Sequence, residues 1–249
     1  MNRRERKLKQ FAAEFRRKNG LNENETIRLK SLLLKNNILT VFLPLSEDLS
    51  GMAVKMNGSN SAKYFILVNS NHTIGRQHFT ICHELYHLYY QENFVSEKSH
   101  AGKFDKDGDP EEYNADVFAS HLLLPENGVY DMIPDKEWGK NKITLPTILN
   151  IEHYFSCSRN ALLNRLLKMG IIDLKRYQEF NHDKIKNALL CGFNIDLYKP
   201  GNKGLIIGNY GNMAKELFDK GIVSESAYFS LLEDIGIDLS DFDEKVDYE

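Results

Sequence analysis

The sequence feature that most constrains the fold is the stretch HFTICHELYHLYY, residues 78–90. It contains the pattern H-E-x-x-H at His83, Glu84 and His87. On an α-helix, side chains four positions apart lie one above the other, so the two histidines can point at a single ion. Glu84 lies one position round the helix, where it can polarise a water on the metal instead of binding the metal. The pattern therefore predicts a helix over about residues 74–91 that carries part of a metal site.

Two histidines do not by themselves make a catalytic metal site, because neighbouring side chains can satisfy both of them on an amphipathic helix. A catalytic zinc ion needs a third protein ligand and an open position for water. The best source of that ligand is the segment PEEYNADVFASHLLLP. We expect it to form a helix over about residues 110–124, with Asp109 as N-cap and Pro110 in the first turn.

Two glutamates of this second helix, Glu111 and Glu112, are candidate ligands. Glu112 is favoured because Asp116 follows one turn later and can accept the remaining N–H of a ligand histidine, which fixes its tautomer. Glu111 has Ala115 in the equivalent position. Small residues at Ala115 and Ala119 would let the helix approach its neighbour closely.

Two further residues, Tyr86 and His121, are candidate oxyanion or substrate contacts. Tyr86 can donate a hydrogen bond near the metal, although aromatic packing explains it equally well. His121 follows Glu112 by nine residues and is expected on roughly the same helix face, as a supporting donor or an alternative ligand. A histidine on the helix surface is the simpler interpretation.

The N-terminal third of the chain combines helices and short strands. Apolar residues at helical spacing predict helices over 3–18 and 23–36. Short β-branched and aromatic runs over 38–45, 51–56 and 63–70 are separated by turn residues, which indicates a small meander-like sheet.

The remainder of the chain is mainly helical. A polar loop follows the H-E-x-x-H helix, and two helices joined by SCS over 142–178 are typical of a helix-turn-helix. We expect an α+β fold in which a small twisted sheet packs on the H-E-x-x-H helix and the third-ligand helix. The predicted boundaries are 1–135 for the N-terminal helices and metal site, 136–180 for the helix-turn-helix-like segment and 181–249 for a small C-terminal α/β unit. A regulatory role is one interpretation of this last unit.

Composition restricts the class of protein. The net charge of −3 favours neither wholesale nucleic-acid binding nor a strongly acidic chain. Three widely spaced cysteines form no disulfide framework, and there is neither a secretory signal nor an apolar run long enough for a membrane span. A soluble cytoplasmic protein is therefore expected. Serine-nucleophile and phosphate-loop signatures are absent from the sequence.

Three segments, YFILVNS, RQHFTICHELYH and EEYNADVFASHLLLP, occur in an order and spacing that resemble the ImmA/IrrE family of zinc metallopeptidases over about residues 50–126. The segment FSCSRNALLNRLLKMGII is similar to the helix-turn-helix-like part of that family. The resemblance implies zinc ligands at His83, His87 and Glu112, with Glu84 as the base. It also implies an intracellular peptidase that commonly cleaves a helix-turn-helix transcriptional repressor in phage, mobile-element, defence or stress settings.

The sequence departs from the family pattern at two positions. Tyr86 stands where glycine is typical, and Cys82 stands where alanine is usual. The tyrosine is expected to narrow the cleft or change its lining without removing a ligand.

The leading hypothesis is a zinc endopeptidase in which Glu84 takes a proton from water and passes it to the leaving amine. We expect the substrate backbone to add as a strand to an edge of the sheet near residues 63–70. An alternative is a regulatory module with a structural or vestigial metal, in which the helices of 142–178 and the basic N-terminal helix contact DNA or a repressor. A third hypothesis is a metal hydrolase that acts on a substrate other than a peptide.

Overall fold

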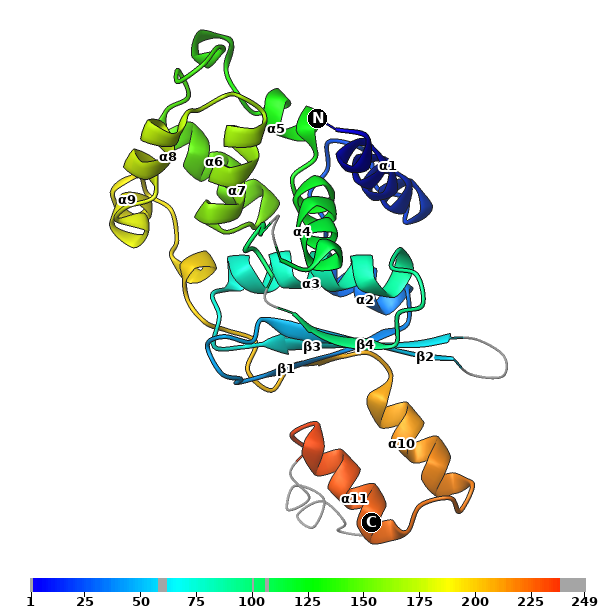
Figure 1. The fold of residues 1–249 in the computed structure, drawn as a ribbon. Coiled ribbons are helices and arrows are strands. Elements are labelled where there is room, and N and C mark those ends of the chain that lie inside the picture. Colours follow the sequence, from blue (N-terminus) through cyan, green and yellow to red (C-terminus); the bar gives the residue numbers. More distant parts are fainter. Residues whose placement is uncertain (1, 58–61, 100, 106–107, 238–249) are drawn as a thin grey trace.

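The computed structural model confirms the mixed α+β class. A layer of helices covers one face of a small sheet, and a helical hairpin extends from its other side (Figure 1). The structure describes residues 2–57, 62–99, 101–105 and 108–237. No helix in these ranges combines the length and the apolar character that a membrane crossing requires.

The sheet has five strands in the order β4-β2-β3-β1-β5. Strands β1 and β3 are parallel, and all other neighbouring strands are antiparallel. The strands are β1 (Ile38–Leu43), β2 (Gly51–Asn57), β3 (Ala62–Asn69), β4 (Ser96–Ser99) and β5 (Ile206–Ile207).

The predicted strands are present, but the predicted meander is wrong, because β3 lies between β1 and β2. The polar loop predicted after the H-E-x-x-H helix contains β4, which pairs with β2 through backbone hydrogen bonds and so needs no apolar pattern. The expectation of a substrate strand near residues 63–70 is also wrong, because β3 has a neighbour on both sides. The described edges of the sheet are β4 and β5.

Helices α3 (Ile74–Tyr89) and α4 (Pro110–Leu123) form the centre of the molecule. Helix α3 lies across the sheet and is buried on most sides, and its buried residues include the polar His83, Glu84 and His87. Helix α4 begins as predicted: the side chain of Asp109 accepts a hydrogen bond from the backbone N–H of Glu111 at 2.7 Å, and Pro110 occupies the first turn. The two helices pack closely, and the small residues Ala115 and Ala119 of α4 are fully buried.

Helix α1 (Arg3–Lys18) has the predicted bounds and packs on α4 through buried apolar side chains. Helix α2 (Leu29–Lys35) begins later than the predicted residue 23. The physical reason is the buried guanidinium of Arg16, which donates to the backbone carbonyls of Asn22 and Glu25. These carbonyls flank a turn at residues 23–24 and do not belong to a helix.

The predicted helix-turn-helix pair is formed by α6 (Leu145–Phe155) and α7 (Arg159–Lys168). The turn between them uses Ser156, in the left-handed conformation at φ 51°, and Ser158, which caps α7 through its side chain. Helix α7 ends just before Gly170, and residues 174–178 of the predicted helical range belong to a separate helix, α8 (Leu174–Phe180). The other elements around this pair are α5 (Glu126–Asp131), α9 (Lys184–Leu190) and the short 3-10 helices at Asp135–Glu137 and Asp196–Tyr198.

The described C-terminal part contains helices α10 (Tyr210–Asp219) and α11 (Glu225–Asp234), which form the projecting hairpin in Figure 1. The segment ALLCGFNIDLYK is helical where it is regular. Strand β5 joins this part of the chain to the main sheet by pairing with β1. Residues 238–249 of the predicted C-terminal unit lie outside the described residues.

Candidate metal centre

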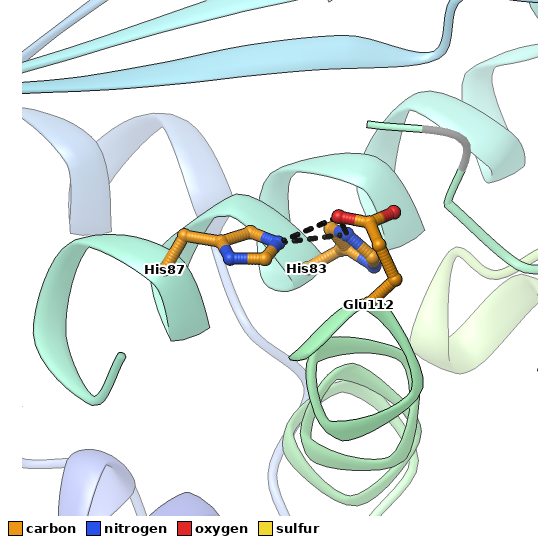
Figure 2. A group of neighbouring side chains, drawn as sticks. All are labelled: His83, His87 and Glu112. Atoms are coloured by element: carbon orange, nitrogen blue, oxygen red, sulfur yellow. Dashed lines mark hydrogen bonds and ion pairs between the residues drawn. The ribbon is translucent and has the colours of Figure 1, made fainter. Parts of the chain in front are cut away.

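Three side chains from two helices converge at the centre of the molecule: His83 and His87 from α3, and Glu112 from the first turn of α4 (Figure 2). The Nε2 atoms of the histidines lie 3.1 Å apart. Oε1 of Glu112 lies 3.5 Å from Nε2 of His83 and 3.2 Å from Nε2 of His87. Four tetrahedral ligands on zinc stand about 3.3 Å apart, because each metal–ligand bond measures about 2.0–2.1 Å. The three atoms therefore have the spacing that a zinc ion requires.

Each histidine is oriented by a hydrogen bond from its other ring nitrogen. Nδ1 of His83 donates to Oδ1 of Asp116 at 2.8 Å, and Nδ1 of His87 donates to Oε1 of Gln91. These contacts place the proton on Nδ1 and leave Nε2 free to bind a metal. Asp116 was predicted from the sequence and Gln91 was not, although Gln91 follows His87 by four residues, just past the end of α3.

Asp116 is itself held by the chain segment that follows β4. Its Oδ1 accepts the backbone N–H of Gly102 at 2.7 Å, and its Oδ2 accepts the backbone N–H of Phe104 at 2.7 Å. The side chain of Asp116 is 5% exposed, so these are hydrogen bonds to a buried charge, which are stronger than those between neutral groups. Asp116 thereby joins the loop, α4 and the candidate ligand His83 in one network.

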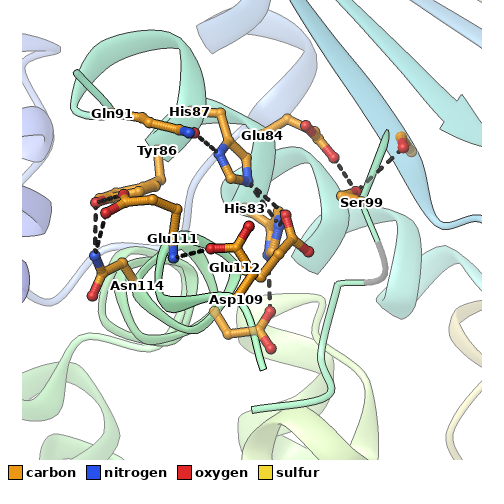
Figure 3. A network of polar contacts seen from close by, with 12 residues as sticks. His83, Glu84, Tyr86, His87, Gln91, Ser99, Asp109, Glu111, Glu112 and Asn114 are labelled. Atoms are coloured by element: carbon orange, nitrogen blue, oxygen red, sulfur yellow. Dashed lines mark hydrogen bonds and ion pairs between the residues drawn. The ribbon is translucent and has the colours of Figure 1, made fainter. Parts of the chain in front are cut away.

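Glu84 lies beside the three ligands but makes different contacts (Figure 3). Its Oε1 accepts a hydrogen bond from the hydroxyl of Ser99 in β4, while its Oε2 is buried without a hydrogen-bond partner in the described chain. Burial raises the pKa of Glu84, and His83, His87 and the Ser99 hydroxyl oppose that rise. A buried carboxylate oxygen without a hydrogen-bond partner, such as Oε2 of Glu84, has the acceptor capacity that a general base for water requires.

The absence of a side chain at Gly51 of β2 leaves space for the carboxylate of Glu84 against the sheet. A Cβ atom on Gly51 would come within 2.7 Å of the carbonyl oxygen of Leu67 and within 3.2 Å of Oε1 of Glu84. Neither this glycine nor Ser99 was identified from the sequence, because both contacts depend on how β2 and β4 pair.

The charges of the cluster favour a cation. Burial alone would lower the pKa of His83, but the carboxylates of Asp116 and Glu112 outweigh it and raise the pKa to about 10. Burial opposes ionisation of Glu112, yet His83 and His87 hold the pKa of its carboxyl well below the usual range. Without a metal the site therefore retains a proton, which a divalent cation would displace.

Tyr86, the bulky residue inside the motif, points away from the metal ligands (Figure 3). Its hydroxyl donates to Oε2 of Glu111 at 2.6 Å and accepts from Nδ2 of Asn114 at 3.1 Å. The structure thus brings Glu112 to the histidines and Glu111 to Tyr86. Cys82, the second departure from the family pattern, is fully buried, and burial raises the pKa of its thiol to about 12 although Arg16 opposes the rise.

His121 does not lie with the metal ligands, and its expected position was wrong in two respects. Nine residues at about 100° each turn the helix by about 900°, so His121 faces the side opposite to Glu112. It is 9% exposed rather than a surface residue, and it lines a cavity together with Lys9 and Arg165.

Comparison with known proteins agrees with this geometry. The profile of the peptidase family M78, described as the IrrE N-terminal-like domain, matches residues 35–167. This is more than half of the chain, and it includes the sheet strands β1 to β4, both ligand-bearing helices and the pair α6–α7. No curated protein matches the chain. With more than half of its length matched and a possible metal site built from two of the matched helices, this chain belongs to the IrrE N-terminal-like domain family of peptidases.

Proposed function

We propose that this protein is a zinc-dependent endopeptidase in which His83, His87 and Glu112 hold the metal. The observation that carries the proposal is the spacing of the three ligand atoms, 3.1 to 3.5 Å, which fits tetrahedral zinc with one position open. Membership of a peptidase family supports the reaction class.

A bound zinc ion would supply Lewis acidity, polarising the scissile carbonyl and lowering the pKa of a water molecule toward ~7. Glu84 would do the proton transfer: its unpartnered Oε2 accepts the proton of the attacking water and later delivers it to the leaving amine. The Ser99 hydroxyl holds the other carboxylate oxygen, which fixes the orientation of Oε2. The pKa of Glu84, raised by burial, suits a group that must both accept and release a proton.

The free edge of β4 is the place where we propose that the substrate backbone binds. β4 pairs with β2 on one side and forms the end of the described sheet on the other. Its last residue, Ser99, contacts Glu84, so a peptide that pairs with this edge would pass the base.

A large cavity whose lining includes Gly102 and Phe104, which donate backbone hydrogen bonds to Asp116, offers room for substrate side chains. It has a volume of about 1150 Å³ and extends along α3 as far as Phe79, one helical turn before His83, but none of the three candidate metal ligands lines it. The cations Arg76 and Lys184 also line it, so apolar and acidic side chains would be favoured there.

The proposed substrate is a helix-turn-helix transcriptional repressor whose removal would derepress phage, mobile-element, defence or stress genes. This part of the proposal is supported by the resemblance to the ImmA/IrrE family. The first candidate to test is a small repressor encoded by a neighbouring reading frame.

The experiment combines metal analysis with a cleavage assay on the purified candidate repressor, read by mass spectrometry. Glu84→Gln should retain zinc and lose cleavage by about 10²-fold or more, because the ligands remain and the base is gone. Glu112→Gln should lose zinc, whereas the neighbouring Glu111→Gln should keep it and serve as the matched control. Cleavage by Glu84→Gln at the wild-type rate would refute the assigned base.

The structure gives less support to DNA binding by the pair α6–α7. Both arginines of α7 are used inside the protein: Arg159 is bonded to Glu152 at 2.5 Å, and Arg165 donates to the backbone carbonyl of Leu124 at 3.1 Å. A recognition helix needs exposed side chains that reach base edges. We therefore propose a structural role for this pair, which a mobility-shift assay across salt concentrations would test.

A further inference from the structure

A second cavity lies on the far side of α4 from the metal ligands, between α1, α4, α5 and α7. Its volume is about 300 Å³, which corresponds to the space of about ten water molecules in the liquid. Its polar lining includes Lys9, Ser120, His121, Glu126, Arg165 and Lys168. No step of the proposed peptidase reaction uses these residues.

Three hydrogen-bond donors around this cavity have no hydrogen-bond partner in the described chain. Nη2 of Arg165 and the hydroxyl of Ser120 are buried and make no hydrogen bond. The acceptor Oε2 of Glu126 stands 3.8 Å from Nη2, which is too far for a hydrogen bond. Neither ring nitrogen of His121 forms a hydrogen bond to a described residue, although this residue is only 9% exposed. Leaving charged and polar donors unsatisfied is costly, so the cavity is suited to a ligand that accepts hydrogen bonds.

The charges around the cavity select an anion. Lys9, Arg165 and Lys168 outnumber the carboxylates of Glu5 and Glu126. Nζ of Lys9 lies 2.6 Å from Oε2 of Glu126, so that carboxylate is already paired with a cation. Burial, followed by the three cations, lowers the pKa of His121 to about 2. The imidazole is therefore neutral, and its N–H can donate without adding charge.

We propose that this cavity binds a phosphate group, which accepts hydrogen bonds from Arg165, Ser120 and His121. The donors come from two helices, α4 and α7, and so approach the ligand from different directions, which suits an acceptor with several oxygen atoms. The cavity has room for free phosphate or for the phosphate of a small ester. Because Ser120 and His121 belong to the helix that carries Glu112, the ligand would brace the third-ligand helix against α7.

The test is isothermal titration calorimetry on the metal-free full chain, with thermal unfolding as a second measurement. The probes are inorganic phosphate, adenosine monophosphate and acetate at matched ionic strength. We expect one phosphate group per chain and a higher midpoint of unfolding with phosphate present. Ser120→Ala should weaken binding about tenfold, because it removes one hydrogen bond to an anion. Arg17→Met, which removes an exposed arginine of α1, should bind as the wild type does.

Tighter binding of the nucleotide than of free phosphate would identify a phosphate ester as the ligand, and the reverse order would identify the free ion. Either result supports the site, provided that Ser120→Ala weakens it. Absence of phosphate binding at millimolar concentration, equal binding of acetate, or unchanged affinity in Ser120→Ala would overturn the proposal. Arg165→Met is a second variant if it folds, and the ring signals of His121 in nuclear magnetic resonance should shift on titration. None of these readouts depends on peptidase activity, so failure here is distinguishable from failure of the proposed function.

Discussion

Replacing Asp116 with asparagine tests the network that orients the proposed metal ligands. The carboxylate accepts three hydrogen bonds, from Nδ1 of His83 and from the backbone N–H groups of Gly102 and Phe104. Asparagine has almost the same shape but only one acceptor oxygen, and its NH₂ group would face one of the three donors. The variant therefore loses at least one hydrogen bond and the negative charge that holds the proton of His83 on Nδ1.

Two magnitudes follow from this geometry. Loss of a partner that orients a metal ligand lowers metal affinity by about 10- to 100-fold, which equals about 1.4–2.7 kcal/mol. Loss of one hydrogen bond to a buried charge destabilises the metal-free fold by about 1.5–3 kcal/mol. Asp116→Asn should thus weaken zinc binding and also lower the stability of the metal-free protein.

Zinc affinity is measured by competition with a chromophoric chelator, and stability by urea unfolding in the presence of a chelator. Asp219→Asn is the matched control, because Asp219 is exposed on α10 and pairs only with Lys215 among the contacts described. If Asp116→Asn bound zinc within a factor of about two of the wild type, Asp116 would not orient a ligand and the reasoning would fail.

Three further predictions concern residues around the centre. Tyr86→Phe should lower the free energy of unfolding by about 1 kcal/mol, because the hydrogen bonds of the hydroxyl to Glu111 and Asn114 are lost. Zinc content should not change, and a loss of zinc would contradict the position of Tyr86 away from the proposed metal ligands. Phe118→Ala should destabilise the fold by about 3–5 kcal/mol in urea unfolding, because this fully buried ring packs between α1 and α3. His121 stays neutral in the folded state but gains a proton in the unfolded chain below its ordinary pKa of 6.5. As the pH is lowered below 6.5, the free energy of unfolding of the wild type should therefore decrease by up to about 1.4 kcal/mol per pH unit more than that of His121→Gln. The measurement is made in phosphate-free buffer, and parallel pH profiles of the two proteins would refute this prediction.

The parts of the site that were predictable from the sequence depend on short-range geometry. His83, Glu84 and His87 share one helix, and their relation follows from the helical period alone. The choice of Glu112 over Glu111 needed one tertiary assumption, that Asp116 supports a ligand. The structure fits that assumption because Asp116 bonds to His83.

The parts that were not predictable depend on strand pairing. Ser99 contacts Glu84 only because the polar segment around it adds to β2 as an edge strand, and edge strands of this kind carry no apolar alternation. The position of β3 inside the sheet depends on a parallel pairing with β1 that periodicity cannot distinguish from a meander. His121 was different, because the helical period already placed it on the face opposite to Glu112.

The bulky side chain of Tyr86 stands where glycine is typical of the ImmA/IrrE family, and its contacts lead to α1, a helix outside the matched domain. The match begins at residue 35, whereas α1 ends at Lys18. Asn114 donates to the Tyr86 hydroxyl and accepts from Nε of Arg4 at 2.5 Å, so the tyrosine is linked to α1 through one side chain. The Tyr86 ring also stacks against Tyr90, which in turn stacks on Phe11 of α1 at 4.5 Å. A glycine here would remove both contacts, so the bulky residue in the motif contributes to the packing of the N-terminal helix and lies outside the cluster of His83, His87 and Glu112.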